Sequence, residues 1–335
     1  MKIQTIFSMA SPYRDDFRIK AYTFGEGEKT LCIVGSMRGD EIQQQYVASR
    51  MVAILKNAEE KGLITNGKSI TVVPCVNPSS INIEKRFWAL DGTDINRMFP
   101  GYDQGETTQR IAAGLFEFIK DFKFGIQLAS YYLPGNFLPH VRMMKTGFED
   151  VEDAHLFGFP YISVHTPEPF DTVLLNYNWQ IWETQAFSLY AGTTDVIDHD
   201  MADMSIDAIC RFMQRKDMLN ISKRQSIRRN MQVDIAPFSG KSTVIDQSNL
   251  INIQAPHAGL FIINCVPGQE VKSGDVLARI THPYEGKEIC SVTSPADGIV
   301  FFARNKSITF QNTLLFRIIK KETTAADSKK EETAE

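Results

Sequence analysis

Short apolar runs that alternate with helical segments constrain the first part of this sequence more than any other feature. Apolar and β-branched residues fill Thr30–Val34, Ser69–Cys75 and Phe124–Leu128, whereas Glu41–Lys56 and Thr107–Lys120 carry apolar residues at helical spacing. Buried strands that alternate with helices predict a parallel α/β sheet. Ligands of such sheets bind beyond the carboxyl ends of the strands, so we expect a site in the loops that follow the three runs.

The character of the sequence changes after residue 232. Ala255–Gly259 (APHAG) recurs in form as Ser294–Gly298 (SPADG), and an apolar run follows each of them. Short strands between Pro and Gly turns predict a small all-β unit. We therefore predict an α/β domain over residues 1–232, a β-barrel-like domain over 233–320 and a disordered charged tail over 321–335.

Composition excludes several classes of protein. Among 335 residues, 36 Lys and Arg face 40 Asp and Glu, a balance that predicts no nucleic-acid partner. The basic stretch Lys223–Gln232 is interpreted as a solvated linker. The first residues are too polar for a signal peptide and no run is long enough to cross a membrane, so we expect a cytoplasmic protein without a membrane partner. The five cysteines are widely spaced, which does not predict a disulfide framework.

Four motifs in a fixed order carry a resemblance to a known family. They are Gly35–Glu41 (GSMRGDE), Val76–Arg86 (VNPSSINIEKR), Asp91–Gly101 (DGTDINRMFPG) and Asn136–Arg142 (NFLPHVR). In this order they resemble the succinylglutamate desuccinylase/aspartoacylase branch of the zinc carboxypeptidases. The resemblance implies a zinc-carboxypeptidase-like mixed or parallel sheet with flanking helices, followed by a small all-β domain of the barrel-sandwich type.

The resemblance also implies a catalytic zinc, which three positions of this sequence contradict. Family members hold zinc with two His and one Glu, and a further Glu activates the attacking water. Here Arg38 and Ala129 stand at the two His positions and Tyr190 stands at the position of the base. Glu41 is the surviving ligand position. The sequence therefore predicts vestigial catalytic positions, no metal ligand set and no cofactor.

The positions that bind the substrate carboxylate in the family are better preserved. Those that match, or that keep the look of the family motif, are Arg86, Asp94, Asn96, Arg97, His140 and Arg142. The resemblance implies that they bind a carboxylate, with Arg acting as a two-pronged donor. A structural alternative stays open, in which Asp94 and Asn96 organise a turn and Arg97 forms an internal pair.

Two substituted positions also leave alternatives open. Arg38 either replaces the charge of the metal by pairing with Glu41 or points into solvent from a degenerate loop. Tyr190 either donates a hydrogen bond to a bound carboxylate or fills the space of the absent base. A relocated metal site, for which His165 is a candidate, is a third alternative.

Three functions are consistent with these observations, and whether the chain is an enzyme stays open. The first is a pseudoenzyme that binds a small carboxylate ligand, such as an acylated amino acid or a peptide end. The second is an active N-acyl-amino-acid amidohydrolase with a rearranged zinc site. The third is a scaffold for protein interactions. The sequence also leaves a homo-oligomer open.

Overall fold

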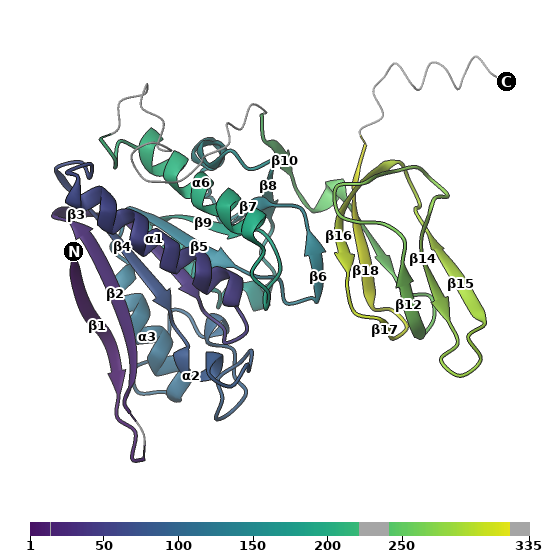
Figure 1. Cartoon of the computed structure of the whole chain (residues 1–335), viewed down its shortest axis with the longest axis horizontal. Helices are drawn as coiled ribbons and strands as arrows, with labels where there is room; N and C mark the ends of the chain where they lie inside the picture. Colours follow the sequence, from purple (N-terminus) through teal and green to yellow (C-terminus); the bar gives the residue numbers. More distant parts are fainter. Residues whose placement is uncertain (14, 221–240, 322–335) are drawn as a thin grey trace. The chain divides into compact units, whose positions relative to one another are not determined.

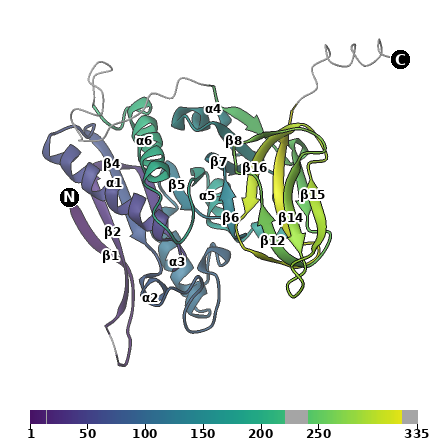
Figure 2. The ribbon, with the colours of Figure 1, turned by 45° about the vertical axis from the view of Figure 1, so that its right-hand side comes forward.

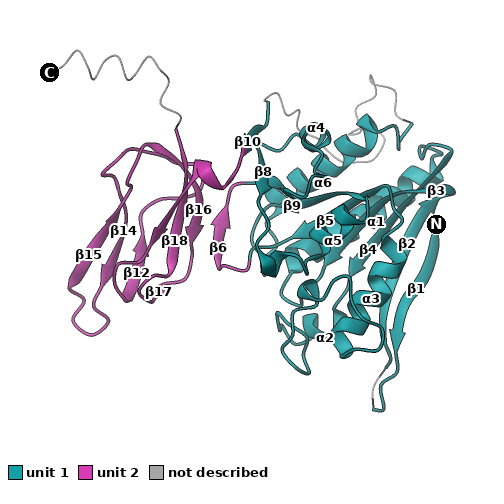
Figure 3. Ribbon diagram, turned by 180° about the vertical axis from the view of Figure 1, so that it is seen from behind, with its two compact units in different colours: residues 1–131, 139–244 teal, residues 132–138, 245–335 magenta. Residues whose placement is uncertain are grey.

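The structure, a computed structural model, describes residues 1–13, 15–220 and 241–321. The chain divides into two compact units (Figure 3). Unit 1 comprises residues 1–131 and 139–244, and unit 2 comprises residues 132–138 and the chain from 245 onward. The domain boundary expected after residue 232 and the basic stretch Lys223–Gln232 lie outside the described residues. So does the expected tail beyond residue 321.

A nine-stranded mixed sheet forms the centre of unit 1. Its strands are β1 (Lys2–Met9), β2 (Phe17–Gly25), β3 (Gly27–Ser36), β4 (Gly67–Cys75), β5 (Phe124–Ala129), β7 (His140–Met144), β8 (Tyr161–His165), β9 (Gln185–Tyr190) and β10 (Thr243–Ile245). They are ordered β1-β2-β4-β3-β5-β9-β7-β8-β10. The central strands β4, β3, β5 and β9 are parallel, whereas β2 and β7 pair with this block in antiparallel fashion. The expected α/β sheet is confirmed, in its mixed form.

Helices cover both faces of this sheet. They are α1 (Ile42–Glu60), α2 (Pro78–Ile81), η1 (Ile95–Arg97), α3 (Thr107–Ile119), α4 (Val151–Ala154), η2 (His155–Phe157), η3 (Pro169–Asp171), α5 (Leu175–Ile181) and α6 (His199–Arg215). α1 and α6 lie side by side on one face in both views (Figure 1, Figure 2). α3 and α5 pack against the other face.

Strand β3 shows why this sequence forms a sheet that is buried on both sides. Leu31 and Ile33 belong to the core under α1 and α6, while Cys32 and Val34 belong to the core under α3 and α5. Because successive side chains of a strand point to opposite faces, a continuous apolar run suits a strand with helices on both sides.

Unit 2 is built from two antiparallel sheets around one apolar core. One sheet contains β6 (Gly135–Phe137), β11 (Leu250–Gln254), β13 (Glu270–Val271), β16 (Gly298–Arg304) and β18 (Leu314–Lys320). The other contains β12 (Gly259–Ile263), β14 (Val276–Thr281), β15 (Glu288–Thr293) and β17 (Ile308–Thr309). The last glycine of each sequence repeat begins a strand, β12 or β16, and the two strands lie in different sheets. The expected C-terminal all-β architecture is confirmed.

The sheet order brings the loops after β3, β4, β5 and β9 to one edge of unit 1, where the sequence motifs lie. Within the described residues, no helix is long and apolar enough to cross a membrane.

Candidate functional site

The side chain of Arg38, in the loop after β3, is buried between two carboxylates. Its Nη1 donates to Oε1 of Glu41 at 3.0 Å. Its Nε and Nη2 donate to the carboxylate of Asp94 at 3.1 and 2.9 Å. Arg38 is only 6 % exposed, so the ion pair with Glu41 is confirmed and the solvent-pointing alternative is wrong. Burial lowers the pKa of this guanidinium, but Glu41 and Asp94 outweigh burial and raise the pKa above its ordinary value.

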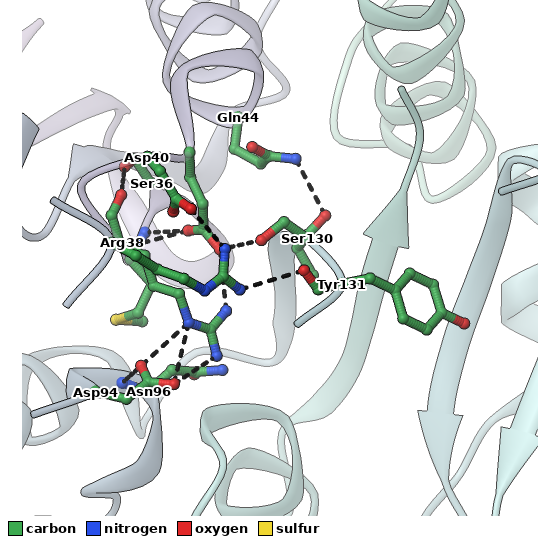
Figure 4. A network of polar contacts seen from close by, with 12 residues as sticks. Ser36, Arg38, Asp40, Gln44, Asp94, Asn96, Ser130 and Tyr131 are labelled. Carbon is green, nitrogen blue, oxygen red and sulfur yellow. Dashed lines mark hydrogen bonds and ion pairs between the residues drawn. The ribbon is translucent and has the colours of Figure 1, made fainter. Parts of the chain in front are cut away.

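Arg38 and Ser130 belong to one polar network (Figure 4), and the carboxylate of Glu41 bonds to both of them. Oε2 accepts the backbone N–H groups of Met37 and Arg38 at 2.8 and 3.0 Å. Oε1 accepts the hydroxyl of Ser130 at 2.6 Å in addition to the Arg38 guanidinium. A carboxylate with four such donors has little remaining capacity for a metal ion or for a proton from water.

The loop that carries Arg38 is held against the motif at residues 76–86. The Gly39 N–H donates to the Arg86 carbonyl at 3.0 Å. A Cβ atom at Gly39 would lie 2.2 Å from the Lys85 carbonyl oxygen, which explains the glycine. The Arg86 guanidinium donates to Asp40 at 2.8 Å and to the Tyr131 carbonyl at 3.2 Å. Burial raises the pKa of Asp40, and Arg86 opposes that rise.

The DGTDINRMFPG motif places two predicted binding residues beside Asp94. Asp94 caps η1 by accepting the Asn96 N–H at 3.0 Å, as the structural alternative expected. The Asn96 side-chain oxygen accepts a hydrogen bond from Gln127 at 3.1 Å, which fixes the carboxamide. Among the described residues, the polar contacts of Arg97 are long, at 3.7 Å to Asp94 and 3.4 Å to the Phe170 carbonyl, and its side chain is 37 % exposed.

Three of the predicted positions lie side by side on neighbouring strands. Ala129 on β5 pairs in register with Tyr190 on β9, which pairs with His140 on β7. The His140 and Tyr190 rings stack at 4.9 Å with an interplanar angle of 3°. Tyr190 also forms a hydrogen bond with Arg142. Tyr190 therefore contacts both the His140 ring and the Arg142 guanidinium.

Arg142 lies two residues along β7 from His140, in the next row of paired residues across the sheet. It is in register with Ser188 of β9, which is in register with Gln127 of β5. Among the described residues, no carboxylate lies within ion-pair distance of Arg142. Burial lowers the pKa of its guanidinium, but electrostatic interactions with Tyr190, Tyr131 and Asp171 outweigh burial and raise it. Arg142 is thus a half-buried cation whose partners differ from those of Arg38.

The residues that the resemblance places at the metal position do not fit zinc. A catalytic zinc needs three protein ligands, and Arg38 and Ala129 supply none. Glu41, the remaining ligand position, is already bonded to a guanidinium and a hydroxyl. In the part of the chain that the structure describes, no three His, Cys, Asp or Glu side chains gather as a metal site. His165 instead contacts Asp171 at 2.9 Å.

Sequence reasoning missed Ser130, Gln44 and Asn176. Ser130 binds Glu41, and Gln44 donates to the Ala129 carbonyl at 3.2 Å. Asn176 lies on α5, outside every motif, and is 3 % exposed. Asn176 and Gln180 lie four residues apart among Leu175 and Trp179, and this polar pair on a buried helix face was the available signal.

Comparison with protein-family models matches residues 27–128 to the Succinylglutamate desuccinylase/Aspartoacylase catalytic domain. The matched stretch includes Arg38, Glu41, Asp94 and Arg97, and it ends one residue before Ala129. The resemblance inferred from the motifs is thereby confirmed. A comparison with curated protein sequences finds no match.

Solved structures of similar fold span almost the whole chain. A succinylglutamate desuccinylase from Silicibacter sp. TM1040 has a TM-score of 0.75 at 17% identity, covering 95% of each chain. A succinylglutamate desuccinylase/aspartoacylase from Rhodobacter sphaeroides has a TM-score of 0.74 at 17% identity, covering 91% of this chain and 89% of its own. The product-bound ectoine utilization protein EutE from Ruegeria pomeroyi has a TM-score of 0.74 at 16% identity, covering 91% and 90%. At such identities the likeness establishes the shared fold.

Proposed function

We propose that this relative of the succinylglutamate desuccinylase/aspartoacylase family is a non-catalytic protein that binds a small carboxylate-bearing ligand. The ligand class is an N-acylated amino acid or a peptide end. The observation that carries the proposal is the buried Arg38, whose guanidinium pairs with Glu41 and Asp94 at the family's metal position. A guanidinium supplies a fixed positive charge, but it has no coordination position at which to activate water.

The absence of a base supports the same proposal. Hydrolysis of an amide needs an activated water and a group that accepts its proton. Tyr190 stands where the family has its base, and it is bonded to Arg142 and stacked on His140. Glu41 accepts donors at both oxygens. No carboxylate at these positions is therefore available to accept a proton from water.

The retained cationic and amide groups support binding. Arg86, Asn96, Arg97, His140 and Arg142 lie at the same edge of the sheet as the Arg38 network. Arg97 is held only by long contacts, so most of its donor capacity is left for an anion. The Asn96 oxygen is occupied by Gln127, which leaves the Nδ2 group as the donor toward a ligand.

Calorimetric titration with a panel of N-acyl amino acids tests the proposal, alongside an assay for amide hydrolysis. We expect at least one panel member to bind without turnover, and the double variant Asn96→Ala/Arg97→Ala to bind it about tenfold more weakly. Turnover that requires zinc and disappears in Glu41→Ala would instead establish the amidohydrolase. Absence of binding across the panel would contradict the carboxylate-binding function.

A further inference from the structure

Helix α5 carries a buried carboxamide that no described residue satisfies. Both Oδ1 and Nδ2 of Asn176 lack a hydrogen-bond partner within the described part of the chain, although the residue is 3 % exposed. Two other carboxamides on the same helix are satisfied. Asn178 donates to the carbonyls of Thr172 and Leu174 at 2.9 Å, and Gln180 bonds to both the N–H and the carbonyl of Met144. Buried polar groups are normally paired, so Asn176 needs a specific explanation.

The contacts of α5 fix where Asn176 points. Trp179 lies against the backbone of Gly125 on β5, and Gln180 bonds to Met144 at the end of β7. Asn176 lies one helical turn before Gln180 and therefore on the same, sheet-facing side of α5.

The position of Asn176 along the strand direction follows from the turn that joins α5 to β9. The Thr184 N–H bonds to the Trp179 carbonyl, so the chain reverses and the start of α5 lies toward the carboxyl end of β9. One helical turn of about 5.4 Å is close to the spacing between alternate residues of a strand. Asn176 therefore faces the next row of the sheet, which contains Gln127, Ser188 and Arg142.

This row contains the guanidinium that has no ion-pair partner among the described residues. Arg142 forms a hydrogen bond with Tyr190, and the carboxylate that acts on its pKa is that of Asp171, through electrostatic interaction. Arg86 and Arg97, the other guanidiniums assigned to ligand binding, already face Asp40 and Asp94. Arg142 is therefore the cation with the most to gain from a ligand carboxylate.

We propose that Arg142 and Asn176 form an inner subsite that takes the carboxylate and the adjacent amide group of one ligand. The inference rests on the proposed function and names the residues that recognise the carboxylate and the amide of the ligand. Arg142 offers a two-pronged donor that matches a carboxylate. Asn176 offers one acceptor and one donor, which match the N–H and the C=O of a secondary amide. Asn176 thereby selects an amide over an ester.

The first experiment measures stability without any ligand. Asn176→Leu replaces an unpaired buried carboxamide by an apolar group of similar size, so we expect an unchanged or higher Tm. Asn178→Leu is the matched control two residues away, and it should lower Tm because two hydrogen bonds are lost. A fall in Tm for Asn176→Leu as large as that for Asn178→Leu would overturn the subsite, because Asn176 would then be satisfied within the fold.

The second experiment measures ligand selection by calorimetry with N-acetylalanine and its ester analogue O-acetyllactate. We expect the wild-type protein to prefer the amide by about tenfold, and Asn176→Leu to reduce this preference to about twofold or less. An undiminished preference in Asn176→Leu would overturn the subsite while N-acetylalanine binding still supported the proposed function. Failure of the wild-type protein to bind N-acetylalanine would also overturn the subsite, whereas binding of other panel members would leave the proposed function standing.

Discussion

Two guanidiniums, the buried Arg38 and the half-buried Arg142, lie at the same edge of the unit 1 sheet and differ in their charged partners. Arg38 is held by the carboxylates of Glu41 and Asp94, with four hydrogen bonds between 2.9 and 3.1 Å. Arg142 contacts the Tyr190 hydroxyl and has no carboxylate within ion-pair distance among the described residues. We therefore expect Arg38 to stabilise the fold and Arg142 to bind the ligand.

The comparison of Arg38 with Arg142 shows that the charge of a side chain does not by itself identify a binding residue. Both guanidiniums have a raised pKa, although Arg38 is buried and Arg142 is half-buried. The two residues differ in their ion-pair partners. Arg38 neutralises the protein's own carboxylates, whereas Arg142 has no carboxylate partner among the described residues. Variants of the two residues should therefore separate stability from binding.

The largest expected effect is that of Arg38→Met on stability. The substitution leaves the carboxylates of Glu41 and Asp94 buried without their cation, which typically costs about 3–5 kcal/mol. Urea unfolding measures the loss. The compensated variant Arg38→Met/Glu41→Gln/Asp94→Asn should recover part of it, because the buried charges are removed together. A loss below about 1 kcal/mol for Arg38→Met would show that the network does not stabilise the fold.

The matched substitution, Arg142→Met, should affect binding instead of stability. No buried carboxylate loses its partner, so we expect the free energy of unfolding to change by less than about 1 kcal/mol. Binding of the best N-acyl amino acid should weaken by about 10- to 100-fold, since a charge-assisted contact is lost. Strong destabilisation with unchanged affinity would reverse the roles that we assign to the two residues.

A smaller effect is expected for Arg97→Ala. Its side chain is 37 % exposed and its contacts are long, so it resembles a surface cation. We expect affinity to fall about two- to fivefold and stability to stay within about 0.5 kcal/mol of the wild type. Calorimetry beside Arg142→Met checks the order, and a larger loss for Arg97→Ala would place the carboxylate at Arg97.

The smallest effect concerns Asp40, the partner of Arg86 in the same loop. Burial raises the pKa of Asp40 in the folded protein, so the folded state binds its proton more tightly than the unfolded chain. The stability that this protonation contributes is present below the unfolded pKa and is lost as pH rises through the folded value. Asp40→Asn should therefore show a flatter unfolding profile from pH 4 upward, and an identical profile would contradict the assignment.

The sequence predicted the fold well because its signals are local and repeated. The apolar runs at Thr30–Val34 and Phe124–Leu128 are strands, and the last glycine of each sequence repeat begins a strand of unit 2. The motifs also located Arg38, Glu41 and Asp94, although Asp94 proved to bind Arg38 and to cap η1. Motif positions alone do not reveal which charges neutralise one another.

Asn176 and the isolation of Arg142 could not be predicted in this way. Asn176 lies outside all motifs, and its lack of partners depends on how α5 lies across β7 and β9. Such facts belong to tertiary packing, in which residues far apart in sequence supply or withhold hydrogen bonds. Asn176 could therefore be found only from the structure, whereas Arg38, Glu41 and Asp94 could be found from the sequence motifs.

The zinc content of the purified protein tests the central claim most directly. Protein produced with added zinc should contain no stoichiometric zinc if, as we propose, Arg38 and Ala129 stand at two ligand positions and Glu41 is held by Arg38. The variant Arg38→His/Ala129→His/Tyr190→Glu serves as the positive control and should gain zinc. One zinc per wild-type chain, lost in Glu41→Ala together with hydrolysis of N-acyl amino acids, would contradict the claim that a guanidinium has replaced the metal.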